Sequence, residues 1–506
     1  MEGSNKDQGP GRGDLTVLGA IALGVVVLHT LTNGQYGLHR DELQVLDDAR
    51  HLDWGFVAYP PFAPVVERVS MALFGTSVAG LRLFSAMAQG LVIFLGGRMA
   101  RELDGKRFAQ VSAALAVAVA PLVIFEGTEF QYSSFDLLWW ALIAYFVIRL
   151  FKSDNPRWWV AVGTVIGLGL VTKYSAAFFV AGIVGGVLLT RARRYLINPW
   201  LWCGVGAALI VFLPNLIWQS RHHFVAVDFL RHIHSRDVSI GRTAGFVKDQ
   251  FLVCTNPLSV PIWLAGLCFY LFEKKGSRYR MLGWVYLITF AIFFVTKGRG
   301  YYLGPAYPML FAAGAVMEEQ WVLSLETGWS RILRMATFAA LAVGGAAAAS
   351  IIVPILSVDS PKNIAIKVNE DLREEIGWKE LVGTVAEIRD SLSPAEQANL
   401  GILAANYGEA GAIDYYGPAY GLPIAISGVN SIWQRGYGEP PPKTLIVLGL
   451  SRRFAESHFQ GCRVAGHSTN PYGIKNEETS EHPDIYVCGP PLKPWPEFWK
   501  GFQYFG

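Results

Sequence analysis

The chain has 506 residues, of which 52% are hydrophobic and only 16% are charged. Soluble domains carry about 25% charged residues, so this composition excludes a disordered, fibrous or purely soluble protein. The apolar residues gather in blocks of roughly 17 to 25, which as helices are long enough to cross about 30 Å of hydrocarbon. The sequence therefore predicts a polytopic α-helical membrane protein.

The apolar blocks predict about eleven transmembrane helices. The first block follows a polar stretch, residues 1–14, that contains Lys6 and Arg12. No small-residue cleavage site appears after this block, so we expect a retained anchor rather than a removed signal peptide. The blocks lie at about 15–33, 77–97, 108–125, 134–151, 158–172, 174–190, 200–218, 256–272, 281–296, 303–317 and 332–355.

The charges of the short loops predict the orientation, because Lys and Arg mark the cytoplasmic side. One set of short connections, which starts at Arg98 and ends at Arg334, carries sixteen basic residues. The opposite set carries only Lys173, Lys297 and Arg299. The N-terminus is therefore predicted to be cytoplasmic, and eleven crossings place the C-terminal tail outside.

The tail differs from the rest of the chain in charge. Residues 1–356 hold 30 basic and 22 acidic residues, whereas 357–506 hold 13 and 18. A helical pattern at 369–392 and the runs LGILAA, LPIAIS, TLIVLGL and DIYVCG predict a small α/β domain. We therefore expect a cytoplasmic tail at 1–14, a transmembrane domain at 15–355 and an extracytoplasmic domain at 356–506. Cys462 and Cys488 would pair in an oxidising compartment or stay as two thiols.

Two long connections lie on the predicted outer side, at 34–76 and 219–255. The first contains HRDELQVLDDARHLDWG, in which Leu43, Leu46 and Leu52 suit a helix lying in the membrane interface. The second carries basic residues between apolar ones. It is either a lid without regular structure or a solvated loop attracted to anionic lipid.

The acidic pair Asp41 and Glu42 is the first candidate for chemistry. Adjacent helix positions point about 100° apart, so one carboxylate would act as a general base on an acceptor hydroxyl. The other carboxylate would orient the first or form an ion pair. The alternative is a solvated interfacial face with Arg40 as the partner.

The three cations of the outer turns are the second candidate, since they could converge on a phosphate. The alternative for Lys173, Lys297 and Arg299 is snorkelling to the membrane interface. Further polar residues are candidates to line a substrate pocket, or else they end helices and form an aromatic belt. They are Glu129, Asp136, Tyr301 and Tyr302.

Five segments together resemble one family. They are YGLHRDELQVLDDARHLDWGFVAYPPFAP, RLFSAMAQGL, LGLVTKYS, FLPNLIWQ and KGRGYYLGPAYPML. They resemble bacterial polytopic glycosyltransferases of the GT-C type, in the branch of the protein O-mannosyltransferases and the lipid A aminoarabinose transferases. The resemblance covers about residues 15–320. It places Asp41, with Glu42 beside it, at the acidic position of the first loop. It also places Tyr59, Pro60 and Pro61 in an aromatic-Pro-Pro segment, where many members have His instead of Tyr59.

The resemblance implies an inverting glycosyltransferase in the bacterial cytoplasmic (inner) membrane. The donor would be a polyprenyl-phosphate sugar, and the acceptor a hydroxyl of a lipid, glycan or protein on the outer face. A divalent cation could help to stabilise the phosphate leaving group, but the sequence does not require one. No nucleic-acid partner is expected. The alternative is a polytopic lipid transporter or flippase. That class commonly has repeated halves and interrupted helices, which the sequence does not display.

Overall fold

The computed structural model describes residues 12–506, so most of the predicted tail at 1–14, including Lys6, lies outside the described residues. The described chain forms two compact units. The helical unit comprises residues 12–31, 82–214 and 237–353. The mixed unit comprises residues 32–81, 215–236 and 354–506. The first predicted long loop therefore belongs to the same unit as the tail, which differs from the expected division at residue 355.

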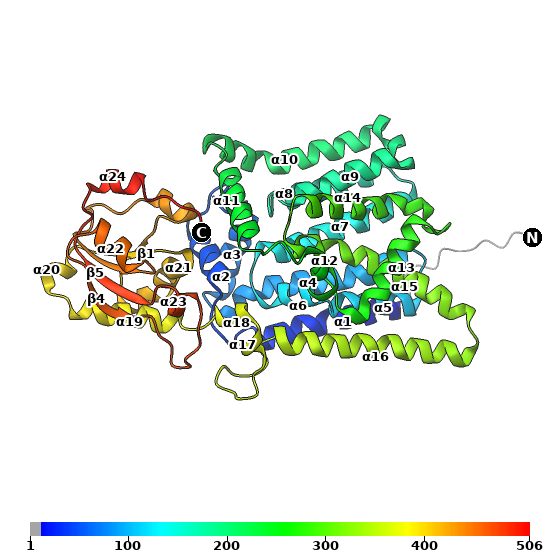
Figure 1. Ribbon diagram of the computed structural model, residues 1–506. Coiled ribbons are helices and arrows are strands. Elements are labelled where there is room, and N and C mark those ends of the chain that lie inside the picture. Colours follow the sequence, from blue (N-terminus) through cyan, green and yellow to red (C-terminus); the bar gives the residue numbers. More distant parts are fainter. Residues whose placement is uncertain (1–11) are drawn as a thin grey trace, which may run out of the picture. The chain divides into compact units, whose positions relative to one another are not determined.

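The helical unit consists of long helices that run beside one another (Figure 1). Its α-helices are α1 (Arg12–Thr32), α4 (Val78–Glu102), α5 (Arg107–Ala118), α6 (Pro121–Thr128), α7 (Tyr132–Ser153), α8 (Trp158–Leu170), α9 (Ala176–Leu189), α10 (Pro199–Arg221), α12 (Phe246–Leu252), α13 (Val260–Leu271), α14 (Arg280–Val295), α15 (Tyr307–Ser324) and α16 (Thr327–Ile352). Short 3-10 helices connect them at η1 (Arg191–Ile197), η2 (Pro257–Ser259), η3 (Gly276–Tyr279) and η4 (Gly300–Ala306).

Each of the eleven predicted apolar blocks contains a helix. Within residues 12–506, six helices are long and apolar enough to cross a membrane, or nine if each of three bent pairs counts as one span. The bends lie between α5 and α6 (58°), between α9 and η1 (99°) and between α12 and α13 (83°). Pro121 and Pro257 start the second part of two pairs, because proline cannot continue a preceding helix. The polytopic helical class is confirmed, while α8 and α15 fall short of a complete span.

Helices α13 and α15 touch through glycines. A Cβ atom on Gly266 would lie 1.9 Å from the carbonyl oxygen of Leu310, and one on Gly314 would lie 1.7 Å from that of Ile262. Small residues let helix backbones approach closely in membrane proteins. This contact fixes α15, whose N-terminus continues directly from η4.

The mixed unit combines a five-stranded sheet with short helices (Figure 1). Its strands are β1 (Leu400–Ala404), β2 (Ala425–Ile426), β3 (Thr444–Leu448), β4 (Arg463–His467) and β5 (Asp484–Cys488). Its helices are α2 (Arg40–Arg50), α3 (Phe62–Phe74), α11 (Val225–Ser239), α17 (Ala365–Val368), α18 (Glu370–Arg373), α19 (Trp378–Ser391), α20 (Pro394–Gln397), α21 (Tyr407–Tyr416), η5 (Gly417–Tyr420), η6 (Asn430–Arg435), α22 (Arg452–His458), α23 (Glu477–Ser480) and α24 (Trp495–Lys500).

The sheet has the order β2-β1-β3-β5-β4. Strands β2, β1 and β3 are parallel, and β5 pairs antiparallel with both β3 and β4. Alternate strand residues point to opposite faces. Ile446 and Val487 therefore pack in one core with α19, whereas Val447 and Tyr486 pack in another with α22 and α24. The sheet is thus covered on both faces.

The four predicted strands are present, and the predicted helix at 369–392 is divided into α18 and α19. Strand β4 was not predicted, because this edge strand is largely exposed and lacks an apolar run. Cys462 and Cys488, the predicted disulfide candidates, are joined by a disulfide bond that links β5 to the residue before β4.

Two expectations for the long connections are wrong. Leu43 and Leu46 of α2 are buried in one core with Ala410 and Ile413 of α21, so they do not insert into the membrane interface. The segment 219–255 is not an irregular lid, because α11 and α12 occupy most of it. Both differences arise from packing partners distant in sequence, which a local pattern does not reveal.

Candidate functional site

Lys173 lies in the turn between α8 and α9, and only 9% of its surface is exposed. Three tyrosine rings face its ammonium group. The Nζ atom lies 4.7 Å from the ring centroid of Tyr302, 5.0 Å from that of Tyr301 and 5.5 Å from that of Tyr132. These distances are within the range of cation–π attraction. Helices α7 and η4 thus supply an aromatic surround for one cation.

The Lys173 ammonium makes no hydrogen bond or ion pair with any residue in the described part of the chain. The charge of Lys173 interacts electrostatically with two buried carboxylates of the same unit, Glu126 and Asp136. Their oxygens have other donors, since Ser133 Oγ donates to Glu126 at 2.8 Å and Trp140 Nε1 donates to Asp136 at 2.9 Å. An ammonium group has three N–H donors, so this one can still accept an anionic ligand.

Arg299 differs from Lys173 because it has a carboxylate partner. Its Nε and Nη2 atoms donate to the Asp237 oxygens at 2.6 and 2.9 Å. The charges of both Arg299 and Lys173 act on Tyr302. Burial and the neighbouring Tyr301 raise the pKa of Tyr302 to about 12, so its phenol stays neutral and can donate a hydrogen bond.

The other predicted residues of the helical unit lie in varied surroundings. Lys297 is exposed, with a left-handed backbone (φ 52°). Buried Glu129 accepts a hydrogen bond from Gln131 Nε2 at 2.7 Å. Tyr301 packs against Tyr302, with 4.8 Å between ring centroids. The structure therefore gathers Lys173, Tyr301 and Tyr302, with Arg299 beside Tyr302, and leaves Lys297 on the surface.

Asp41 and Glu42 occupy the first turn of α2 and have different partners. The N-cap residue His39 donates its backbone N–H to Glu42 Oε2 at 2.7 Å, and its Nδ1 accepts from the Asp41 N–H at 3.2 Å. Glu42 is buried in this capping box, whereas Asp41 is half-buried. Asp41 Oδ1 accepts a hydrogen bond from the Tyr407 hydroxyl at 2.9 Å. Asp41 is therefore the more accessible carboxylate of the pair.

Tyr59 belongs to a buried ionic network of the mixed unit. Its hydroxyl donates to Asp48 Oδ2 at 2.7 Å. Arg435 pairs with both Asp47 and Asp48, with 2.7 Å between Nη2 and Asp48 Oδ1. Burial raises the pKa of Asp48 to about 7 against the opposing charge of Arg435. The predicted pocket residue Tyr59 thus has its hydroxyl committed to a carboxylate.

The prolines after Tyr59 shape the chain. Pro60 is buried in the turn, and Pro61 is the N-cap residue of α3. This position agrees with the predicted turn at 59–62. Nothing in the contacts of these prolines assigns them a ligand.

Several residues of these sites were not predicted. Asp47 and Asp48 stand in the acidic loop, where their adjacency was a usable signal. Arg435, Tyr407 and Asp237 had no such signal, because their partners lie far away in sequence. Among residues 12–506, no group of three or more His, Cys, Asp or Glu side chains is arranged to hold a metal ion.

Comparison with known proteins relates the chain to membrane glycosyltransferases. Residues 58–218 match the family model described as dolichyl-phosphate-mannose-protein mannosyltransferase. The chain is 26% identical to the lipid A galacturonosyltransferase RgtD of Rhizobium johnstonii, over 78% of this chain and 80% of the relative. It is 24% identical to an undecaprenyl phosphate-alpha-4-amino-4-deoxy-L-arabinose arabinosyl transferase of Pseudomonas fluorescens, over 53% of this chain and about half (48%) of the relative.

A solved structure matches the fold over nearly the whole chain. It is ArnT from Cupriavidus metallidurans bound to undecaprenyl phosphate, with a TM-score of 0.58 and 15% identity, and the match covers 95% of this chain and 98% of that one. None of these findings favours the flippase alternative. They confirm the resemblance found in the sequence: the chain is similar to polytopic membrane glycosyltransferases of the protein mannosyltransferase and aminoarabinose transferase type, and it shares its fold with ArnT.

Proposed function

We propose that this enzyme moves a sugar from a polyprenyl-phosphate donor to an acceptor hydroxyl at the outer face of the bacterial inner membrane. One observation carries the assignment of the donor. The shielded ammonium of Lys173 faces three tyrosines and makes no hydrogen bond or ion pair with the described residues. A buried cation in a membrane protein is costly unless it is paired or functional. A phosphate group supplies the missing partner.

In the proposed reaction the acceptor oxygen attacks the anomeric carbon and inverts it. The bond from this carbon to the phosphate oxygen breaks, and the electron pair leaves with the polyprenyl phosphate. Asp41 accepts the proton of the attacking hydroxyl. Lys173 stabilises the charge that develops on the leaving phosphate, with a hydrogen bond from Tyr302. Glu42 positions α2 through its capping box.

The remaining candidate residues have supporting roles in this proposal. Arg299 adds positive potential near Tyr302 while paired with Asp237. Glu129, Asp136 and Tyr301 shape the surroundings of the donor phosphate. Tyr59, Pro60 and Pro61 shape the fold around α2. Lys297 contributes an exposed charge. The sugar, the acceptor and any requirement for a divalent cation stay open.

The transfer reaction is tested in detergent, where no sealed compartment exists. The purified chain is given a short-chain polyprenyl-phosphate sugar, and release of polyprenyl phosphate is followed by mass spectrometry. Transfer or hydrolysis by the wild type, and its loss in Asp41→Asn, supports the enzyme. Activity that appears only in sealed vesicles contradicts it. Analysis of envelope glycans, glycolipids and glycoproteins after gene deletion then identifies the sugar and the acceptor.

We further propose that the N-terminus is cytoplasmic and the C-terminal domain extracytoplasmic. The sixteen basic residues of one loop set against three in the other support this orientation. The disulfide between Cys462 and Cys488 also favours an oxidising compartment for the domain.

Thiol labelling tests the orientation. Cys203, Cys254 and Cys268 are free thiols, so all three are first replaced by serine. In that background Ser391→Cys should react with an impermeant reagent on spheroplasts, whereas Ser277→Cys should react only after lysis. Both residues are exposed. Labelling of Ser277→Cys alone in intact spheroplasts reverses the orientation.

A further inference from the structure

The carboxylate of Asp41 has one oxygen that is held and one that is available. The Tyr407 hydroxyl donates to Asp41 Oδ1 at 2.9 Å. Oδ2 makes no hydrogen bond or ion pair with any residue in the range 12–506. Each oxygen of an ionised carboxylate can accept hydrogen bonds. Oδ2 can therefore accept the proton of an acceptor hydroxyl while Oδ1 stays bound to Tyr407.

The phenol of Tyr407 is the donor in this pair. Burial, together with the nearby charge of Asp41, raises the pKa of Tyr407 well above that of a free tyrosine. Since an ionised carboxylate can only accept hydrogen bonds, the bond runs from tyrosine to aspartate. A hydrogen bond to a charged acceptor is roughly twice as strong as one between neutral groups. This bond is therefore strong enough to fix the orientation of the Asp41 side chain.

The ring of Tyr407 is restrained by the residue that precedes Asp41. The Arg40 guanidinium lies 5.2 Å from the centroid of this ring, within the range of cation–π attraction. Its Nη2 atom donates to Glu477 Oε1 at 2.9 Å, and Nη1 pairs with the other oxygen of the same carboxylate. An arginine–carboxylate pair with two bonds has a defined geometry. Arg40 therefore holds the ring that carries the donor hydroxyl.

Glycines bring α21 close to α2, beside which it lies in Figure 1. A Cβ atom on Gly408 would lie 2.9 Å from the Cβ atom of Arg40, and one on Gly411 would lie 2.7 Å from the carbonyl oxygen of Leu43. Residues four apart share one face of a helix, so Tyr407 and Gly411 lie on the face of α21 toward α2. This close approach of the two helices brings the Tyr407 hydroxyl within reach of Asp41.

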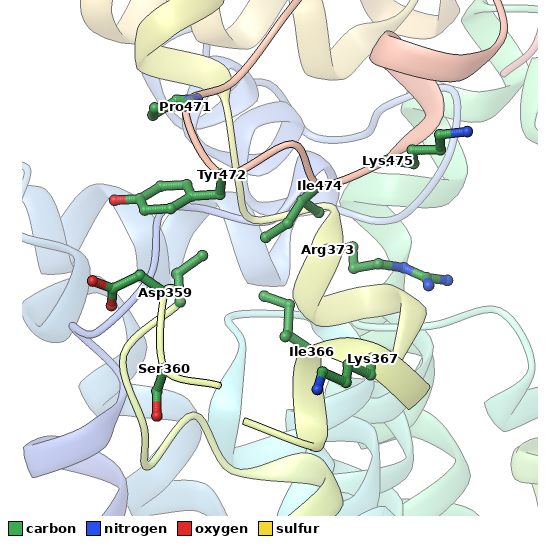
Figure 2. Close-up of a pocket in the computed structure, with 10 residues that line it drawn as sticks. Asp359, Ser360, Ile366, Lys367, Arg373, Pro471, Tyr472, Ile474 and Lys475 are labelled. Carbon is green, nitrogen blue, oxygen red and sulfur yellow. The ribbon is translucent and has the colours of Figure 1, made fainter. Parts of the chain in front are cut away.

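The segment that supplies Glu477 is itself anchored. The Glu477 N–H donates to Glu374 Oε1 at 3.2 Å. The loop before α23 lines a cavity together with α17, and Figure 2 shows Ile474 of the loop near Ile366 of α17. Ile474 packs against the small core that contains Ile366. Glu477 therefore offers Arg40 a fixed carboxylate.

We propose that Tyr407 is a positioning residue of the transfer reaction and that it acts through Asp41. This inference rests on the proposed role of Asp41 as the general base. The bond to Oδ1 fixes the carboxylate, while Arg40 holds the tyrosine ring. When the acceptor hydroxyl transfers its proton to Oδ2, Oδ1 becomes a carbonyl oxygen that still accepts from Tyr407. Tyr407 therefore keeps its own proton throughout the step.

Tyr407→Phe tests this role, because it removes only the hydroxyl and keeps the ring beside Arg40. The single-turnover rate of sugar transfer from a short-chain polyprenyl-phosphate donor should fall at least about tenfold, as for the loss of one hydrogen bond to a charged group. Affinity for polyprenyl phosphate should stay within about twofold, because a lower rate with unchanged binding marks an interaction that matters only in the reaction.

Rates are compared at saturating donor, after thermal unfolding has confirmed that the variant is folded. A wild-type rate in folded Tyr407→Phe overturns the proposal. A loss of donor affinity with an unchanged rate also overturns it.

Tyr415→Phe is the matched control, because it removes the hydroxyl of another tyrosine of α21. The Tyr415 hydroxyl donates to the Thr76 carbonyl oxygen rather than to Asp41. Its transfer rate should therefore stay within about twofold of the wild type. An equal loss in Tyr407→Phe and Tyr415→Phe would show that the packing of α21 explains the effect, and would overturn the proposal.

A double-mutant cycle determines whether Tyr407 acts through Asp41. In the Asp41→Asn background the base is already absent, so adding Tyr407→Phe should change the residual transfer rate by less than about twofold. A further loss there, as large as in the wild-type background, would show that Tyr407 acts independently of Asp41 and overturn the proposal.

Arg40→Lys tests the restraint on the tyrosine ring, because lysine keeps the charge but lacks the planar pair with Glu477. The transfer rate should fall by a smaller factor than in Tyr407→Phe, while donor affinity is retained. An unchanged rate in a folded Arg40→Lys protein overturns the role assigned to Arg40.

The same measurements separate this proposal from the proposed function. Loss of activity in Asp41→Asn, together with full activity in Tyr407→Phe, overturns the positioning role and leaves Asp41 as the base. Full activity in Asp41→Asn contradicts the base itself and overturns the positioning role with it.

Discussion

The shielded cations of the two units have two kinds of surroundings. In the mixed unit Arg435 pairs with Asp47 and Asp48, and Arg40 forms two hydrogen bonds with Glu477. In the helical unit Lys173 is held by tyrosine rings and makes no ion pair within the described chain. Removing one partner of a buried pair leaves an uncompensated charge. The paired cations are therefore expected to stabilise the fold, and the unpaired one to bind a ligand.

The largest effect is expected at Asp41. We propose that this carboxylate acts as the general base, although it lies in the mixed unit, where the paired cations are expected to stabilise the fold. Asp41→Asn keeps the size and most hydrogen-bonding capacity of the side chain but removes the base. We expect turnover to fall by about 100- to 10,000-fold, the usual range for general base catalysis. Donor affinity should change by no more than a few fold. Single-turnover transfer and polyprenyl phosphate binding measure the two effects.

Glu42→Gln serves as the matched control for Asp41. It keeps an oxygen that can accept the His39 N–H in the capping box, so activity should be largely retained. Full activity in a folded Asp41→Asn protein, with loss of activity in Glu42→Gln, would transfer the role of the base to Glu42.

The second largest effect is expected on stability, when Arg435 is replaced. Arg435→Gln leaves Asp47 and Asp48 buried without their cation, which should lower the free energy of unfolding by about 3–5 kcal/mol. Thermal and denaturant unfolding of the detergent-solubilised chain measure this loss. The triple variant with Asp47→Asn and Asp48→Asn should recover much of it. No recovery would show that the arginine acts through packing rather than charge.

Lys173 and Arg299 allow the same comparison within the helical unit, because Arg299 has a carboxylate partner and the Lys173 ammonium has no ion pair within the described chain. Lys173→Gln should weaken polyprenyl phosphate binding by about 1.5–3 kcal/mol, the range for hydrogen bonds to charged groups, with little loss of stability. Arg299→Gln removes the arginine that pairs with buried Asp237, so its main effect should be a lower melting temperature. A reversed pattern, with Lys173→Gln unstable and Arg299→Gln defective in binding, would overturn the rule drawn from the two units.

Glu409 gives an effect that is small at each step in pH, a dependence of stability on pH. Burial raises the pKa of Glu409 from 4.5 to about 7. Between these values the folded state keeps a proton that the unfolded state releases. Stability should therefore fall as the pH rises through this window, by at most about 1.4 kcal/mol per pH unit for this group. Glu409→Gln should flatten the slope of unfolding free energy against pH. An unchanged slope would show that Glu409 does not titrate in this range.

The sequence predicted the elements better than their partners. The eleven apolar blocks and four strands depend on local composition, so each was found as a helix or strand. The burial of Leu43 and Leu46 depends on α21, more than 300 residues away. The same leucine spacing suits a membrane surface or a protein core, and only the tertiary partner decides between them.

In the candidate site, too, local sequence predicted individual residues better than their partners. Lys173 was a candidate because a cation in an otherwise uncharged turn is conspicuous, and Tyr302 because a tyrosine can stack on a sugar or hydrogen-bond to phosphate. The pairing of Arg299 with Asp237 was missed, because Asp237 lies in a segment expected to be irregular. Local sequence identifies which side chains are chemically capable, whereas their availability depends on contacts between distant segments.

The core of the mixed unit joins Leu43, near the start of the chain, to Val487, near its end. A ribosome adds about 5–20 residues per second, so synthesis of the intervening chain takes about 20 to 90 seconds. During that time α2 has no completed core, and its leucines and buried acids stay uncovered. A chain that stops before β5 is made would lack part of the core that contains the leucines of α2, even with every membrane helix already inserted. The core around the first loop is therefore complete only after the last strand has left the ribosome.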